Sequence, residues 1–188
     1  MTHMRIAIIV AMDKEFIRIK ELLEQVEETA IGGRSYTSGR LGNNELVLHQ
    51  CGIGKVNAAI GVTELIRLFN PDLVVSALGQ NDGVQDSSKF ASAYLDFIRM
   101  LREKNPSADI ALISSPMADD TLRTFFKALL PAIAAEAEAQ GFAGKSGKIP
   151  YHVFERGFNA GGAAHPDMAE HEVIAAEVTR FIKDEFGF

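Results

Sequence analysis

One carboxylate stands where an open α/β sheet binds its ligands. Arg5–Ala11 (RIAIIVA) is a nearly continuous apolar run, the pattern of a central parallel strand buried on both faces. Asp13 can cap a helix that follows, and Glu15 lies within its first turn, at the carboxyl end of that strand. A carboxylate in this place could contact a bound ligand. The alternative is that Glu15 only stabilises the positive end of the helix dipole.

A thiol and a glycine-rich turn come next along the chain. Cys51 ends a predicted strand, so it could serve as a nucleophile, although inert packing is the more common use of a lone cysteine. A chain with one cysteine forms no internal disulfide, which suits a reducing cytoplasm. Gly52–Lys55 resembles a phosphate-cradling turn but lacks the full P-loop pattern.

The histidines inside predicted elements favour structural roles. His49 and His152 fall in predicted strands, and His171 lies on the closing helix, six residues after His165. Zinc sites need a third ligand at suitable spacing, and the sequence offers none. We therefore expect neither a metal nor another cofactor.

The elements that must position these residues alternate between strands and helices. This order predicts an α/β fold, a doubly wound, Rossmann- or flavodoxin-like three-layer sandwich with a mostly parallel sheet and one N-terminal β-hairpin. The 188 residues fit one domain, 1–188. Strands are expected at 5–11, 35–41, 45–50, 72–78, 109–114 and 148–154; helices are expected at 16–26, 56–69, from Ser87 or Ser88 to 104, from Asp119 or Asp120 to 139, and 166–186.

Composition excludes several partners. Nineteen Lys and Arg against 25 Asp and Glu give a net charge of −6, which disfavours a phosphate-backbone partner, so no nucleic acid is expected. No apolar run reaches the roughly 18 residues of a membrane span. A cytoplasmic protein with a small-molecule ligand is the expectation.

Residues 4–75 resemble the 5′-methylthioadenosine/S-adenosylhomocysteine nucleosidases of the purine phosphorylase superfamily. The resemblance rests on MRIAIIVAMDKEF, GGRSYTSGRL, CGIGKVNAAIG and NPDLVV, which occur in that family's order and spacing. It implies that Glu15 helps to activate the hydrolytic water and that Met12 and Ile53 line a pocket for an adenine nucleoside. It also implies a homodimer formed partly through Ile53–Leu68. Alternatively, the apolar residues of this helix (Val56, Ala59, Ile60 and Leu65) all face the chain's own sheet.

The later half of a nucleosidase is not matched. The family needs a glutamate after a methionine to bind the ribose hydroxyls, and an aspartate to protonate the departing purine. Neither occurs in a suitable context after residue 80, and Gly79–Gly83 (GQNDG) replaces the family's serine-containing glycine turn. The nucleosidase catalytic set is therefore incomplete.

Residues 76–188 resemble the SGNH (GDSL-like) hydrolases, especially their carbohydrate-esterase branch. Gly79-Gln80-Asn81-Asp82 follows a strand ending in LVVSALG, and His165-Pro166 opens the run HPDMAEHEVIAAEVTRFI. By this resemblance Asn81 and Gly79 help to form an oxyanion hole and His165 is the general base, acting on an ester. Without the resemblance, Asn81-Asp82 is an Asx turn and His165 a pre-proline residue.

The nucleophile of these hydrolases is missing. Ala11-Met12-Asp13 stands where the family carries Gly-Asp-Ser, and Gly162 replaces the aspartate that usually precedes the histidine. The leading hypothesis is therefore a recombined chimera without efficient activity. A crossover within Asp72–Leu78 favours engineering, with natural fusion as the alternative. The other hypotheses are a weak esterase that uses Asn81 and His165 with water or Cys51, and a purine-nucleoside-binding module.

Overall fold

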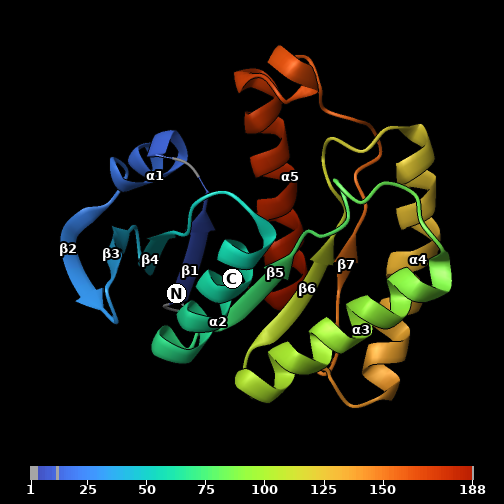
Figure 1. The fold of residues 1–188 in the computed structure, drawn as a ribbon, viewed down its shortest axis with the longest axis horizontal. Coiled ribbons are helices and arrows are strands. Elements are labelled where there is room, and N and C mark those ends of the chain that lie inside the picture. Colours follow the sequence, from blue (N-terminus) through green and yellow to red (C-terminus); the bar gives the residue numbers. More distant parts are fainter. Residues whose placement is uncertain (1–3, 12, 188) are drawn as a thin grey trace. The chain divides into compact units, whose positions relative to one another are not determined.

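The described strands form two sheets in two compact units. The computed structural model describes residues 4–11 and 13–187, without the side chains of Lys14, Glu15 and Lys55. Unit 1 comprises Met1–Leu73 with Glu103–Ala108, and unit 2 comprises Val74–Arg102 with Asp109–Phe188. The mixed α/β class is confirmed, whereas the single doubly wound sheet is not: the strand order is β1-β4-β3-β2 in one sheet and β5-β6-β7 in the other (Figure 1).

Unit 1 contains the predicted hairpin. The strands β3 (Arg34–Leu41) and β4 (Asn44–Gln50) are antiparallel, with Thr37 opposite Leu48. The strand β1 (Arg5–Val10) pairs in parallel with β4 and lies at an edge of this four-stranded sheet, so the expectation of a central strand is wrong within this unit. Beyond β3 lies β2 (Glu24–Ile31), which is largely exposed.

Both faces of the unit 1 sheet are covered because side chains alternate along each strand. Leu46 and Leu48 share a cluster with residues of α1 (Asp13–Lys20), whereas Val47 packs with Leu65 of α2 (Lys55–Phe69). The helix α2 ends as predicted, with Asn70 in the left-handed region before Pro71. The helix expected to continue to Val26 instead ends at Lys20, and Val26 belongs to β2.

Unit 2 is built on short strands and long helices. The strands β5 (Leu73–Ser76), β6 (Asp109–Ile113) and β7 (Tyr151–His152) are shorter than the sequence predicts. The helices are α3 (Ser87–Lys104), α4 (Asp120–Ala139) and α5 (Met168–Phe186), with a 3-10 turn at Gly162–Ala164. Figure 1 shows them in green, orange and red around this sheet.

Helix caps in unit 2 follow side-chain chemistry. Asp119 Oδ1 accepts from Leu122 N at 2.8 Å, the cap predicted for α4. The cap of α3 is neither Ser87 nor Ser88: Asp86 Oδ1 accepts from Lys89 N at 2.9 Å, because an aspartate one residue earlier reaches the free amide. Asp167 and Glu170 form a capping box at α5.

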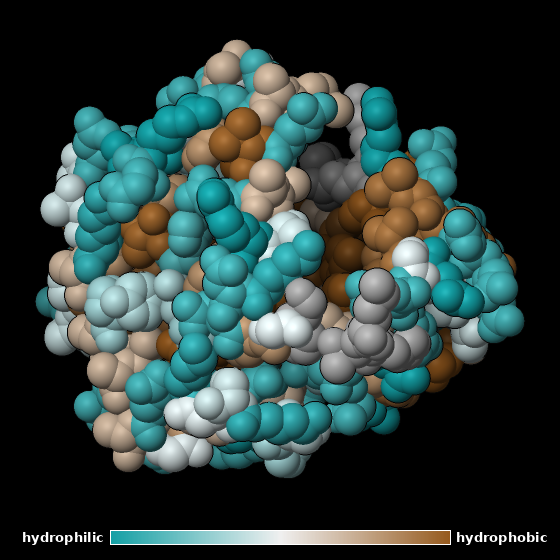
Figure 2. Space-filling view, turned by 180° about the vertical axis from the view of Figure 1, so that it is seen from behind, coloured by the Kyte–Doolittle hydropathy of each residue, from teal (hydrophilic) through white to brown (hydrophobic). Residues whose placement is uncertain are grey.

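The surface seen from behind is mainly hydrophilic, with apolar residues interspersed in brown (Figure 2). Phe126, Phe154 and Phe158 are buried in unit 2, where they account for much of the apolar core. Within the described ranges, no helix combines the length and the apolar character needed to cross a membrane.

Candidate functional site

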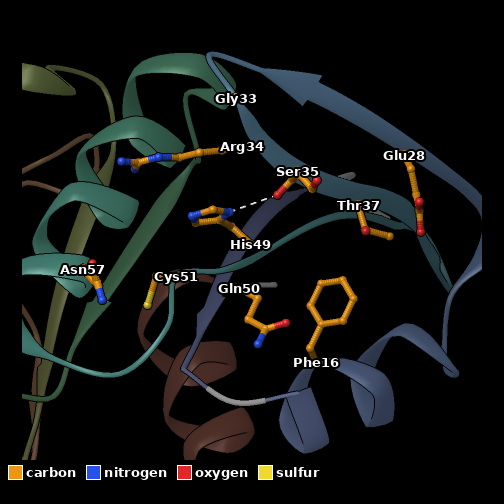
Figure 3. A pocket seen from close by; sticks show the side chains of 10 residues that line it. All are labelled: Phe16, Glu28, Gly33, Arg34, Ser35, Thr37, His49, Gln50, Cys51 and Asn57. Carbon is orange, nitrogen blue, oxygen red and sulfur yellow. Dashed lines mark hydrogen bonds between the residues drawn. The ribbon is translucent and has the colours of Figure 1, made fainter.

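Unit 1 holds an open cavity of about 540 Å³ at the carboxyl end of β4. Figure 3 shows its side chains converging from α1, the hairpin strands and the start of α2. Its lining residues are Phe16, Glu28, Gly33, Arg34, Ser35, Thr37, His49, Gln50, Cys51 and Asn57.

Backbone geometry at the end of β4 places three consecutive lining residues. Cys51 N donates to Val10 O at 2.9 Å, which extends the pairing of β1 and β4 by one step. Gly52 and Gly54 have φ of 81° and 117°, values that side-chain-bearing residues rarely adopt, so the chain can turn sharply into α2. This turn therefore places His49, Gln50 and Cys51, at the end of β4, next to the first residues of α2.

His49 is buried yet reaches the cavity. Its side chain is 4% exposed, and its Nδ1 lies 3.0 Å from Ser35 O. The ring stacks on Tyr36, with centroids 4.8 Å apart and planes 28° apart. The strand placement predicted for His49 is confirmed. Its place in a cavity lining was not predicted, because Ser35 and Tyr36 come beside it only through hairpin pairing.

The charge at the cavity edge is neutralised. Glu64 Oε2 accepts from Arg34 Nη1 at 2.7 Å and from Tyr36 Oη at 2.8 Å. The Tyr36 hydrogen bond, followed by the Arg34 charge, lowers the pKa of Glu64. Burial, followed by the bond to Glu64, raises the pKa of Tyr36. Arg34 is therefore committed to Glu64, which disfavours a phosphate-binding role for this edge.

Three further lining residues already donate to protein groups. Gln50 Nε2 donates to Asp13 Oδ1 at 2.7 Å, so Asp13 holds Gln50 and is the first residue of α1 rather than its cap. Asn57 Nδ2 donates to Ile53 O at 2.9 Å, and Cys51 Sγ donates to Gly52 O at 3.1 Å. Cys51 is thus partly buried and hydrogen-bonded.

None of the side chains expected from the nucleosidase resemblance is described as lining the cavity. Met12 and the side chain of Glu15 lie outside the described residues; the backbone of Glu15 is in the first turn of α1, next to Phe16. Ile53 is 77% exposed and is not part of the cavity lining. Within α2, Val56 is 72% exposed whereas Leu65 is buried, so the expectation that all its apolar residues face the chain's own sheet is wrong.

The residues expected from the esterase resemblance lie in unit 2. Gly79 has a φ of 102°, and a Cβ there would come within 2.9 Å of Phe90 and 3.0 Å of Phe126, so packing alone requires this glycine. Asn81 and His165 are both exposed, and no hydrogen bond in the described part of the chain joins them.

The remaining described histidines, His152 and His171, lie in unit 2. His152 lies in β7, as predicted, with Nε2 2.8 Å from Glu177 Oε1. His171 lies on α5, as predicted, and is exposed. Residues 4–11 and 13–187 contain no group of three His, Cys, Asp or Glu side chains that could hold a metal ion.

Comparisons with known proteins match residues 5–77 to the phosphorylase superfamily. The 5′-methylthioadenosine/S-adenosylhomocysteine nucleosidase of Listeria welshimeri serovar 6b is 43% identical over 84 residues, which are 43% of this chain and 36% of that protein. The Geobacillus kaustophilus nucleosidase is 47% identical over 73 residues, 39% of this chain and 31% of that protein. The chain thus spans about a third of the length of these relatives.

A solved structure extends the similarity beyond the nucleosidase-like segment. This structure is a family two carbohydrate esterase from Clostridium thermocellum in complex with cellohexaose, and it is 27% identical to this chain with a TM-score of 0.54. The match covers 62% of this chain and 37% of the esterase chain. The esterase structure thus matches 62% of this chain, whereas the Geobacillus nucleosidase matches 39%, so the similarity to the esterase includes residues outside the nucleosidase match. For residues 5–77, the match to the phosphorylase superfamily and the similarity to the nucleosidases confirm the predicted resemblance.

Proposed function

We propose that unit 1 binds a purine nucleoside and that the chain takes part in processing such nucleosides. The observation that carries this proposal is the position of the cavity: every lining residue lies between Phe16 and Asn57, inside the segment 5–77 that matches the phosphorylase superfamily. A volume of about 540 Å³ falls in the range of small-molecule sites, roughly 300–1,000 Å³.

The lining chemistry supports an uncharged, partly aromatic ligand. Phe16 offers a ring against which a base can stack. The two charged lining residues are paired, Arg34 with Glu64 and Glu28 with Lys20. The other lining residues include the neutral Thr37, Gln50 and Asn57. A nucleoside combines an aromatic base with hydroxyl groups and therefore fits this lining better than a nucleotide.

Glu15 is the proposed water-activating carboxylate. Its backbone position next to Phe16 puts it on the helix that borders the cavity. Met12 is proposed to contact the nucleoside beside it, as in the nucleosidase resemblance, whereas Ile53 lies outside the cavity lining and is not given this role. Because the ribose-binding glutamate and the purine-protonating aspartate were not found, we expect slow turnover.

Release of adenine from methylthioadenosine tests this function. We expect wild type to release adenine slowly and Glu15→Gln to do so about 10²–10⁴-fold more slowly still, since that is the usual contribution of a general base. Equal rates in the two proteins would overturn the role of Glu15. Nucleoside binding without any release would point to the catalytically inactive recombined chain.

Ester hydrolysis is a second candidate, favoured by the 27% identity to the carbohydrate esterase. Asn81 and Gly79 of unit 2 would stabilise an oxyanion and His165 of the same unit would act as base, with water as nucleophile; Cys51, the other nucleophile expected from the sequence, belongs to unit 1. Such an incomplete set can retain about 10³–10⁴-fold catalysis over water. Hydrolysis of p-nitrophenyl acetate should then fall in His165→Ala, and equal rates would remove this candidate.

A homodimer through α2 is the proposed assembly. Ile53 and Val56 are exposed apolar residues at the start of this helix, and a second copy could cover them. Light scattering should then give twice the chain mass for wild type and the chain mass for Val56→Glu. A monomeric wild type would contradict the assembly.

A further inference from the structure

The protonation pattern of His49 follows from its partner. Nδ1 lies 3.0 Å from Ser35 O, and a backbone carbonyl can only accept a hydrogen bond. Nδ1 must therefore carry the proton, which leaves Nε2 of the neutral ring as an acceptor. Among the described residues, Nε2 has no hydrogen-bond partner. His49 is 4% exposed and lines the cavity (Figure 3), and Nε2 is not one of the fully buried side-chain atoms, so it is open to the cavity.

Tight packing fixes the direction of this acceptor. Tyr36 stacks on one side of the ring. A Cβ on Gly61 would lie 3.1 Å from His49 Cδ2 and 3.0 Å from Cys51 Cβ, so α2 also approaches the ring closely because residue 61 has no side chain. The ring can neither rotate nor exchange its nitrogens without losing the Ser35 hydrogen bond. Nε2 is therefore held in one orientation before any ligand arrives.

Neighbouring lining residues add further acceptors beside Nε2. The amide nitrogens of Gln50 and Asn57 and the thiol of Cys51 already donate to Asp13, Ile53 and Gly52. Their amide oxygens have no hydrogen-bond donor among the described residues. These amide oxygens and His49 Nε2 are acceptors that hydrogen-bond donors of a ligand can pair with, while each amide group keeps one further N–H.

We infer that His49 determines specificity at this site: its Nε2 accepts a hydrogen bond from an N–H or O–H group of the bound molecule. This inference rests on the proposed nucleoside binding and adds to it the group that reads the ligand. In a nucleoside the donor is the exocyclic amine of the base or a ribose hydroxyl. Nucleosides that lack the matching donor shield Nε2 from water without pairing it, and therefore bind more weakly.

Two substitutions separate the nitrogens of the ring. His49→Asn keeps an amide donor near the position of Nδ1, so the bond to Ser35 O can persist, but it removes the group at Nε2. His49→Gln places an amide near Nε2, where its oxygen can accept, and gives up the bond to Ser35 O. We expect calorimetric titration with adenosine to give about 10-fold weaker binding for His49→Asn and about threefold for His49→Gln.

His171→Asn is the matched control, since His171 is exposed on α5 in unit 2 and its replacement should leave the affinity unchanged. Ligand analogues then locate the donor: purine riboside lacks the exocyclic amine, and 2′- and 3′-deoxyadenosine each lack one hydroxyl. The analogue that lacks the matching donor should bind wild type and His49→Asn equally.

The outcomes distinguish this inference from the function beneath it. If wild type binds no nucleoside, the proposed function fails. If wild type binds adenosine and His49→Asn binds it equally tightly, only the role of His49 fails. Should His49→Asn not fold, ¹⁵N spectra of histidine-labelled wild type decide. A ligand-induced shift of the unprotonated Nε2 signal of His49 supports the inference, and no shift overturns it.

Discussion

The two units place their chemistry-bearing side chains differently. In unit 1, His49 is buried, oriented by Ser35 and Tyr36, and lines a cavity. In unit 2, Asn81 and His165 are exposed and share no hydrogen bond within the described residues. Groups held by packing are preorganised for a ligand, whereas exposed groups must be ordered when the ligand binds, at a cost in affinity. A sequence motif therefore indicates ancestry, and burial with defined partners is what makes a site.

The aromatic residues differ in the same way. Phe126 in unit 2 is fully buried against Phe90 and Phe125, whereas Phe16 in unit 1 is half-buried and borders the cavity. The first belongs to a core and the second to a site. Matched substitutions in the two units can therefore separate stability from binding.

The largest effect is expected from Phe126→Ala. Removing a fully buried ring leaves a cavity, so the free energy of unfolding should fall by about 3–5 kcal/mol in urea denaturation. Phe16→Ala is the comparison: it should cost clearly less stability but weaken nucleoside binding. If Phe16→Ala destabilised as much as Phe126→Ala and left binding unchanged, the distinction between core and site would be lost.

Gly61→Ala should have the next largest effect. Its Cβ would lie 2.5 Å from Ile9 Cδ1, closer than real contacts allow, and 3.0 Å from Cys51 Cβ, so the Ile9 side chain must move aside against its neighbours. Overpacking of this kind costs roughly 1–3 kcal/mol, measurable as a lower urea midpoint. Gly162→Ala in unit 2 is the control, because nothing lies within 4 Å of the added carbon. Equal midpoints for the two variants would argue against close packing of α2 on unit 1.

Asp119→Ala tests a helix cap in unit 2. Loss of the 2.8 Å bond to Leu122 N should lower the free energy of unfolding by about 1 kcal/mol. Asp120→Ala removes the neighbouring aspartate, whose side chain is 94% exposed and pairs with Arg123 at the surface, and should cost less. The reverse order of the two effects in thermal unfolding would contradict the assigned cap.

The smallest effect on stability is expected from protonation of Glu64 at low pH. Its pKa is lowered, chiefly by the Tyr36 hydrogen bond and then by Arg34, so the folded state favours the carboxylate. That stabilisation is present above the ordinary pKa of 4.5 and is lost as pH falls through the lowered value. Tyr36→Phe should therefore lose less stability than wild type when the pH falls from 6 to about 3. Glu172→Gln, at an exposed site, serves as the control, and an unchanged acid profile in Tyr36→Phe would refute the coupling.

Local sequence patterns predicted the elements best where one period dominates. The helix expected at 56–69 is observed as Lys55–Phe69, and the hairpin around Gly42 has the predicted pairing. The prediction of a helix to Val26 was wrong because Val26 also suits a strand, and the long-range pairing of β2 with β3 decided between helix and strand. That residues 1–188 form one domain stays a prediction.

The candidate site was predicted only in part. The strand end at Cys51 was visible in the sequence, and Cys51 lines the cavity, whereas the glycines of the predicted turn, Gly52 and Gly54, are not among the lining residues. The pairing of His49 with Ser35 was not, because it arises from hairpin register and not from spacing within one element. A histidine at the end of a hairpin strand is the signal that could have pointed to it.

Calorimetric titration of the full chain with methylthioadenosine tests the central claim most directly. If unit 1 binds a purine nucleoside, heat should be released or absorbed until one ligand is bound per chain, and Phe16→Ala should weaken the binding. Absence of binding at millimolar ligand, with a correctly folded protein, would contradict the proposed function.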